Sequence, residues 1–188
     1  MKTVTANGFT LVETAIVVTI GAILLSGALS GYKTYLNKER YETTKERLSK
    51  IAKALDDYRR LPSNANKNLP CPAPLHAAPG TAGYGHDVAT TLGVACNSAP
   101  GAALGDTVSR PSGPAAPVQY VRVGAVPFAT LGISAEDALD AWGNRLLYAV
   151  SEKHTDTTAL YDSNNGSITV KDDTGSVIGA DKVPFFVY

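Results

Sequence analysis

The sequence predicts an α+β fold in which a long N-terminal helix packs on a small antiparallel β-sheet. Three observations support this prediction. An apolar run over residues 9–30 is followed, over residues 31–61, by an amphipathic helical pattern without a proline. Residues 62–117 are rich in proline, glycine and alanine and show little periodicity. Over residues 118–188, short runs typical of strands alternate with turn residues.

The apolar run is long enough to cross a membrane. It has 22 residues and a single charged side chain, Glu13. A helix that rises about 1.5 Å per residue reaches roughly 33 Å over this length, which matches the hydrocarbon core of a bilayer. A secretory signal peptide is the competing interpretation, because Lys2 supplies a positive n-region and residues 28–30 resemble a small-residue cleavage site. The run is longer than the apolar core of such peptides, roughly 7 to 15 residues, so we expect a membrane-spanning helix.

Glu13 is an unfavourable residue near the start of such a helix. A carboxylate in apolar surroundings needs a cationic partner or must take up a proton. An α-amino group can be that partner. The alternative is a side chain that reaches water at the membrane edge.

Residues 8–13, Gly-Phe-Thr-Leu-Val-Glu, follow a short leader that contains Lys2. This segment resembles the processing site of type IV prepilins and type II secretion pseudopilins. The resemblance implies that residues 1–8 are a leader peptide, that prepilin peptidase cuts between Gly8 and Phe9, and that Phe9 is then N-methylated. It also implies that Glu13 meets the N-terminal amine of a neighbouring subunit, which neutralises both groups and sets the axial register of assembly.

The same resemblance implies a pilin-like structural subunit and not an enzyme. Its partners would be prepilin peptidase, other pilins or pseudopilins, and an inner-membrane assembly platform. The protein would cross the inner membrane once, with a cytoplasmic N-terminus and a periplasmic C-terminal domain, before it enters a filament in the cell envelope. The basic residues after the span outnumber Lys2, which on the positive-inside rule alone would place the domain in the cytoplasm. We follow the resemblance, because long domains cross membranes largely regardless of charge.

The sequence leaves several functions open. Within the favoured class, the chain is a subunit of a type II secretion pseudopilus or of a type IV pilus, in a major role or in a minor or divergent one. The alternative class is a conventionally exported periplasmic binding protein or enzyme, cut by signal peptidase after Ser30. Basic and acidic residues are equal, at 17 each, so no nucleic-acid partner is expected.

Residues 31–61 are predicted to continue the membrane-spanning helix into water. Leu48, Ile51, Leu55 and Tyr58 recur at spacings of three and four residues, as they do on one face of a helix. The first proline of the chain is Pro62, where the helix is expected to end.

Residues 62–117 are predicted to form a long irregular loop, because they hold nine of the eleven prolines. The two cysteines of the chain, Cys71 and Cys96, both lie in this loop. In an exported domain such a pair is expected to form a structural disulfide that ties the loop down. The alternative is a pair of reduced, buried cysteines.

The remainder, residues 118–188, is predicted to form the β-sheet region of the periplasmic domain. Ser134 has the position of an N-cap for a short helix that ends near Trp142. Turn residues at 164–166 and 172–175 suit hairpin connections, because Asn, Asp and Gly tolerate positive φ. The expected strands are 118–123, 146–150, 167–170 and 183–188.

Residues 140–148 resemble a second pilin-related segment. In pseudopilins this segment reads Asp-Pro-Trp-Gly-Asn-Pro and is followed by a strand that bears an aromatic residue. The present chain matches it at Asp140, Trp142, Gly143, Asn144 and Tyr148, and has Ala and Arg at the two proline positions. We expect a structural role: Trp142 fills the core, Gly143 turns the chain, and Asp140 hydrogen-bonds the backbone of the turn.

No residue pattern in the sequence predicts catalysis. The three histidines, His76, His86 and His154, are scattered and lack the spacing of a metal site or a catalytic triad. Asp162 and Asn164 offer oxygen ligands near a turn and are a weak candidate calcium site, and a plain hairpin turn is the favoured interpretation of these residues. No other cofactor is expected.

Overall fold

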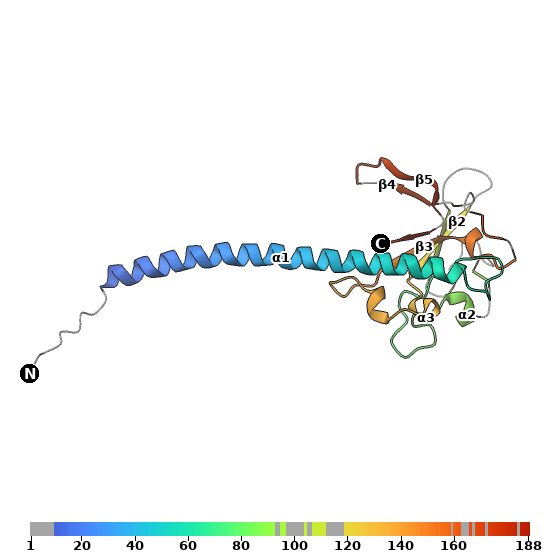
Figure 1. The fold of residues 1–188 in the computed structure, drawn as a ribbon, viewed down its shortest axis with the longest axis horizontal. Coiled ribbons are helices and arrows are strands. Elements are labelled where there is room, and N and C mark those ends of the chain that lie inside the picture. Colours follow the sequence, from blue (N-terminus) through green and yellow to red (C-terminus); the bar gives the residue numbers. More distant parts are fainter. Residues whose placement is uncertain are drawn as a thin grey trace, which may run out of the picture. The chain divides into compact units, whose positions relative to one another are not determined.

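The structure is a computed structural model, drawn as a ribbon in Figure 1. It forms two compact units, Met1–Glu42 and Thr43–Tyr188, which are described separately below. The residues that the structure describes are 10–92, 95–96, 104, 107–111, 119–158, 160–162, 166, 168–171, 173–183 and 185–188.

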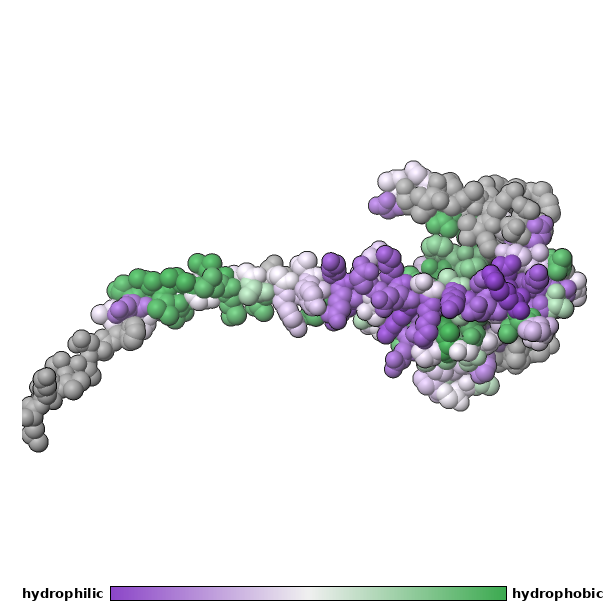
Figure 2. Space-filling model, in the orientation of Figure 1, coloured by the Kyte–Doolittle hydropathy of each residue, from purple (hydrophilic) through white to green (hydrophobic). Residues whose placement is uncertain are grey.

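Helix α1 (Leu11–Arg59) contributes to both units. Its bounds agree with the helix expected from the apolar run to Pro62. Every residue from Leu11 to Leu29 is exposed, and Figure 2 shows the apolar residues gathered on this first part of α1 and polar residues on its later part. Among the described residues, α1 is the one helix that is long and apolar enough to cross a membrane.

The second unit contains an antiparallel four-stranded sheet with the order β1-β2-β3-β6, of which β2 and β3 are labelled in Figure 1. The α+β fold class is therefore confirmed. Two further strands, β4 and β5, pair with each other in a separate hairpin. The strand bounds are β1 Val108–Pro111, β2 Tyr120–Ala125, β3 Leu147–Ser151, β4 Ile168–Lys171, β5 Val177–Val183 and β6 Phe185–Val187.

Two of these strands were not predicted, β1 and most of β5. Strand β1 lies inside the segment that was expected to be irregular, and it ends at Pro111. Within the described sheet it is an edge strand, paired with β2, which is the position where a sheet tolerates proline. The same segment also contains a short helix, α2 (Val88–Leu92).

The short helix expected from Ser134 to Trp142 is reduced to a single 3₁₀ turn, η1 (Ala135–Ala138). Ser134 does cap it, because the Ser134 side chain accepts a hydrogen bond from the Asp137 backbone N–H. The turn ends early because Leu139 is extended and pairs with Arg145 in an antiparallel bridge. Two other short helices, α3 (Phe128–Leu131) and η2 (Glu152–Thr155), were not predicted.

The core of the second unit lies between the later part of α1 and one face of the sheet. Ile51 and Leu55 of α1 are fully buried and belong to one cluster with Tyr148 and Val150 of β3, which are also 0 % exposed. Leu48 packs partly buried against the same cluster. The spacing of three and four residues therefore identified the face of α1 that meets the sheet, and burial of each such side chain contributes roughly 1.5 to 3 kcal/mol.

Candidate functional site

At the start of α1, Thr10 and Glu13 form reciprocal hydrogen bonds. The Glu13 backbone N–H donates to the Thr10 Oγ1 at 3.3 Å, and the Thr10 backbone N–H donates to the Glu13 Oε2 at 3.3 Å. The Thr10 hydroxyl also donates to the same carboxylate oxygen at 3.3 Å. This is a capping box, in which two backbone donors at a helix start are satisfied. Glu13 therefore has a local hydrogen-bonding role besides the role expected from the resemblance.

The capping role of Thr10 was missed at the level of sequence, although its signal is present. A threonine followed three residues later by a glutamate, just before an apolar run, is the pattern of a capping box. Gly8 and Phe9, which flank the expected cleavage site, lie outside the described residues.

A comparison with protein families decides the nature of this segment. Residues 5–29 match the model of the prokaryotic N-terminal methylation motif. The chain carries the signature of type IV prepilins and pseudopilins. The match covers the expected cleavage site, the Thr10–Glu13 capping box and most of the exposed apolar part of α1. No curated protein and no solved structure matches the chain.

The methylation motif coincides with the part of α1 that is most exposed. An apolar residue left in water forgoes roughly 1.5 to 3 kcal/mol of burial, so such a surface requires a membrane or a protein partner. Its large exposed apolar residues are Leu11, Val12, Ile16, Val17, Val18, Ile20, Ile23, Leu24, Leu25 and Leu29. The motif and the exposed helix are together consistent with membrane anchoring, and they are typical of a structural subunit.

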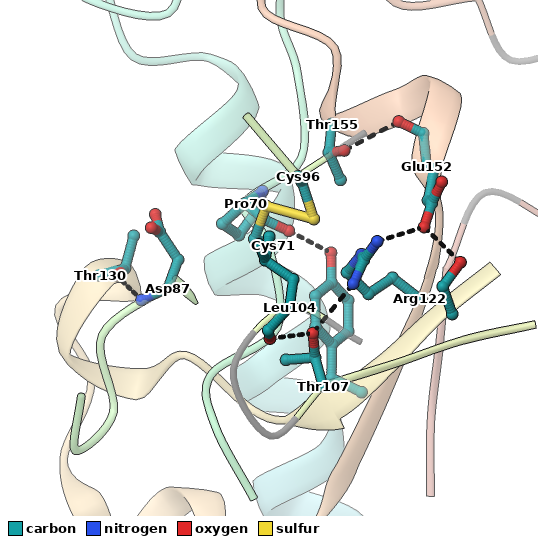
Figure 3. Close-up of a disulfide and its surroundings, with 12 residues drawn as sticks. Pro70, Cys71, Asp87, Cys96, Leu104, Thr107, Arg122, Thr130, Glu152 and Thr155 are labelled. Atoms are coloured by element: carbon teal, nitrogen blue, oxygen red, sulfur yellow. Dashed lines mark hydrogen bonds and ion pairs between the residues drawn. A yellow bond between two sulfur atoms is a disulfide. The ribbon is translucent and has the colours of Figure 1, made fainter. Parts of the chain in front are cut away.

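Cys71 and Cys96 form a disulfide in the second unit (Figure 3). Both residues are buried, at 4 % and 1 % exposed, and Val88 and Leu104 complete a small cluster around them. The loop beside Cys71 is also attached to the sheet by its backbone, because Ala73 and Ala125 exchange two hydrogen bonds of 2.8 and 2.9 Å. The disulfide thus adds to a loop segment that is already paired with β2.

Tyr148 connects the same loop to the core. Its side chain is fully buried, and its hydroxyl donates to the Pro70 carbonyl oxygen at 3.1 Å. Burial raises the pKa of Tyr148 well above its usual value, so the hydroxyl keeps its proton. The aromatic residue of the second pilin-like segment is therefore a core residue that also holds the loop.

A buried ion pair lies close to the disulfide, and the sequence analysis did not find it. Arg122 of β2 and Glu152 approach to 2.7 Å, and their side chains are 0 % and 5 % exposed. Ser109 Oγ donates to Glu152 Oε1 at 2.6 Å. Arg122 Nη1 donates to Thr107 Oγ1 at 3.2 Å (Figure 3). No local signal in the sequence identifies this pair, because alternation along the strand sets Val121 and Val123 on the opposite face from Arg122 and so predicts an outward arginine.

Residues 140–144 form a tight turn around the Asp140 carboxylate. Its Oδ1 accepts from the backbone N–H groups of Trp142 at 2.9 Å and Asn144 at 2.7 Å, and its Oδ2 accepts from Asn144 Nδ2 at 2.9 Å. The hydrogen bond from the Asn144 side chain is the largest cause that lowers the pKa of Asp140. Gly143 has φ +87°, where a side chain would be strained.

The expectation that Trp142 fills the core is wrong. Its side chain is 51 % exposed. The reason is geometric, because the hydrogen bonds to Asp140 hold residues 142–144 in the turn and leave the indole at the surface. The core position in this region is taken by Leu146 and Tyr148, which are 5 % and 0 % exposed.

Side chains of the later part of α1 form hydrogen bonds with the backbone of this turn. Arg47 Nη1 donates to the carbonyl oxygens of Leu139 and Asp140, each at 3.0 Å. Thr44 Oγ1 accepts from the backbone N–H of Ala141 at 3.1 Å. One turn further along α1, Lys50 forms an ion pair of 2.5 Å with Asp137, and its hydrogen bond is the largest cause that lowers the pKa of Asp137. Polar side chains of α1 thus position the second pilin-like segment.

Of the two residues of the candidate calcium site, one lies within the described part of the chain. Asp162 is exposed, and Asn164 lies outside the described residues. In the part of the chain that the structure describes, no three His, Cys, Asp or Glu side chains gather in a group that could hold a metal ion. His154 is buried and lies against the Tyr161 ring at 4.7 Å between centroids.

Proposed function

We propose that this protein is a structural subunit of a type II secretion pseudopilus or a type IV pilus. In this proposal, prepilin peptidase cuts between Gly8 and Phe9, Phe9 is N-methylated, and the subunit assembles through the N-terminal part of α1. The observation that carries the proposal is the methylation motif at residues 5–29, which includes the exposed apolar start of α1. A helix of this kind suits two successive environments, a bilayer and the apolar interior of a filament.

Glu13 gives the assembly step its specificity in this proposal. In the uncut chain its carboxylate accepts hydrogen bonds from Thr10. Cleavage creates a charged amine at Phe9, one helical turn away, and a neighbouring subunit offers the same group. A carboxylate and an amine that pair in low-dielectric surroundings are favourable at one axial register only, because displaced subunits would leave both charges unpaired.

The second unit is proposed to face the periplasm. The disulfide between Cys71 and Cys96 supports this orientation, because disulfides persist in oxidising compartments. Within the proposal, the segment from Asp140 to Tyr148 favours the type II secretion pseudopilus over the type IV pilus, since it resembles the corresponding pseudopilin segment. The partners are the peptidase, other pilins or pseudopilins, and the inner-membrane assembly platform.

The mature N-terminus tests the proposal. Intact mass and N-terminal peptide mapping of protein from membrane fractions should give a chain that begins at methylated Phe9. Gly8→Leu should block cleavage, whereas the neighbouring substitution Asn7→Ala should leave it unchanged. A mature chain that begins at Gly31 would instead support a conventionally exported protein, and an unprocessed chain would contradict both readings.

A further inference from the structure

Three tyrosines occur on α1 between the apolar stretch and the end of the first unit. Tyr32, Tyr35 and Tyr41 are 60 %, 64 % and 64 % exposed. Aromatic side chains of this size are usually buried against a partner, and burial of one stabilises by roughly 1.5 to 3 kcal/mol. Their exposure on the helix therefore requires an explanation outside the core of the domain.

The first two tyrosines continue an apolar stripe of the helix. Leu25, Leu29 and Tyr32 are separated by four and three residues, so their side chains lie along one side of α1. Leu25 and Leu29 are 62 % and 53 % exposed, which places Tyr32 at the end of a continuous exposed stripe. Tyr35 follows three residues later and extends the same side of the helix.

The direction of helical side chains brings these rings back toward the apolar stretch. Long side chains on a helix lean toward its N-terminus and cover the preceding turn. The Tyr32 ring therefore covers the last turn of the apolar stretch, while its hydroxyl remains able to bond water or a lipid headgroup. Between the two tyrosines, Lys33 is exposed and carries a charge that favours phosphate groups.

We propose that Tyr32 and Tyr35, with Lys33 between them, anchor α1 in the headgroup layer of the bilayer. The occupant of this surface is lipid, because the tyrosines follow directly on an apolar run of membrane length and tyrosine is enriched at membrane–water interfaces. The inference rests on the proposed function, in which residues 9–30 span the membrane. The anchor sets the depth of α1 in the bilayer before the subunit is assembled into the filament.

Tyr41 is a matched control within the same helix. It is exposed to the same degree as Tyr35, but it lies nine residues after Tyr32, about 14 Å further along the axis. At that distance a ring has left the headgroup layer that holds Tyr32. The proposal therefore predicts different surroundings for two residue positions that are equally exposed in the protein alone.

Single-tryptophan variants of the full chain in phospholipid vesicles test this difference. The chain has one tryptophan, so Trp142→Phe removes the background signal, and Tyr32→Trp, Tyr35→Trp or Tyr41→Trp then introduces one reporter. Lipids brominated close to the headgroup should quench reporters 32 and 35 more than lipids brominated near the chain ends. Both emission maxima should lie to the blue of reporter 41, which should not be quenched.

The outcomes separate the anchor from the membrane span itself. If reporters 32 and 35 behave as reporter 41 while the protein stays in the membrane fraction after carbonate extraction, the anchor is wrong and the span stands. Stronger quenching of reporter 32 by chain-end bromines would likewise overturn the anchor. Loss of the protein from the membrane fraction would instead overturn the proposed function. In a Leu24→Trp reporter, the pair Tyr32→Ala and Tyr35→Ala should shift the quenching depth, whereas Tyr41→Ala should not.

Discussion

The first part of α1 (residues 11–29) and the second unit (Thr43–Tyr188) differ in which side chains they expose and which they bury. Residues 11–29 expose a run of large apolar side chains, and the charged residue among them, Glu13, is hydrogen-bonded to Thr10 three residues away. The second unit buries Ile51 and Leu55 completely, and it also buries the charged pair of Arg122 and Glu152. The apolar surface of the first region is accessible to partners outside the chain, whereas the second unit buries its apolar and charged side chains against one another.

This difference separates residues that matter for assembly from residues that matter for folding. A change in the exposed part of α1 removes contacts with a membrane or a neighbour, so the isolated subunit should keep its stability. A change in the buried network of the domain leaves unsatisfied polar groups or charges, so stability should fall before any assembly step. The predictions below test this division, from the largest expected effect to the smallest.

Glu13→Leu should abolish incorporation into the filament without loss of membrane insertion or cleavage. The substitution removes the carboxylate that the neighbouring amine would meet, and it makes the span more apolar. Crosslinking or co-purification with partner pilins measures incorporation, and a gel shift measures processing. Glu42→Leu, on the same helix beyond the motif, should assemble normally. Normal incorporation of Glu13→Leu would refute the role of Glu13 in register.

Arg122→Met should destabilise the domain by about 3 to 5 kcal/mol, because it leaves the Glu152 carboxylate buried without its cation. Denaturant unfolding of the full chain in detergent measures the loss. The control is Arg110→Met on the neighbouring strand, where the arginine is exposed and the expected change is within about 0.5 kcal/mol. Equal stability of the two variants would show that the buried pair contributes nothing to the fold.

The double substitution Cys71→Ser and Cys96→Ser should cost about 3.5 kcal/mol on the chain-entropy account, since the two cysteines are 25 residues apart. The attached loop should still fold, because Ala73 and Ala125 keep their backbone pairing. Unfolding midpoints with and without reductant measure the effect in the native protein and serve as its own control.

In the native protein, thiol alkylation under denaturing conditions without reductant should label neither cysteine. Full labelling of both residues in freshly isolated protein would contradict the bond and weaken the proposed periplasmic location.

His154 should make the domain less stable as the pH falls from about 6.5 to about 4. Burial, followed by the charge of Arg59, lowers the pKa of His154 from 6.5 to about 4, so the unfolded chain takes up a proton that the folded chain excludes. Stability is full above the unfolded pKa, declines through this window by about 3 kcal/mol because each pKa unit is worth about 1.4 kcal/mol, and levels off below it.

Denaturant unfolding at several pH values measures this slope. Charges of both signs act on the imidazole, because Lys153 also lowers the pKa of His154 whereas Asp162 raises it. His154→Gln should remove the pH dependence of the free energy of unfolding between pH 4 and 6.5. His86→Gln, at an exposed position, should retain it. A slope that survives in His154→Gln would assign the pH dependence to other groups.

The N-terminal segment and the buried face of α1 could be predicted because their features are local in sequence. The apolar run, the glycine at position 8 and the glutamate at position 13 are visible without a fold, and so is the spacing that directs Ile51 and Leu55 to the sheet. Periodicity is sufficient for these features because a helix presents residues three and four apart on one face.

The arrangement of the domain depended on contacts between distant residues. No local pattern shows that Arg122 meets Glu152, that β1 pairs with β2 at an edge, or that Arg47 holds the turn at Asp140. Trp142 makes the point most directly, because its apolar ring predicts burial while the turn built on Asp140 holds it at the surface. Hydrophobicity determines how much a side chain gains from burial, but only the tertiary structure determines whether the backbone can bring it to the core.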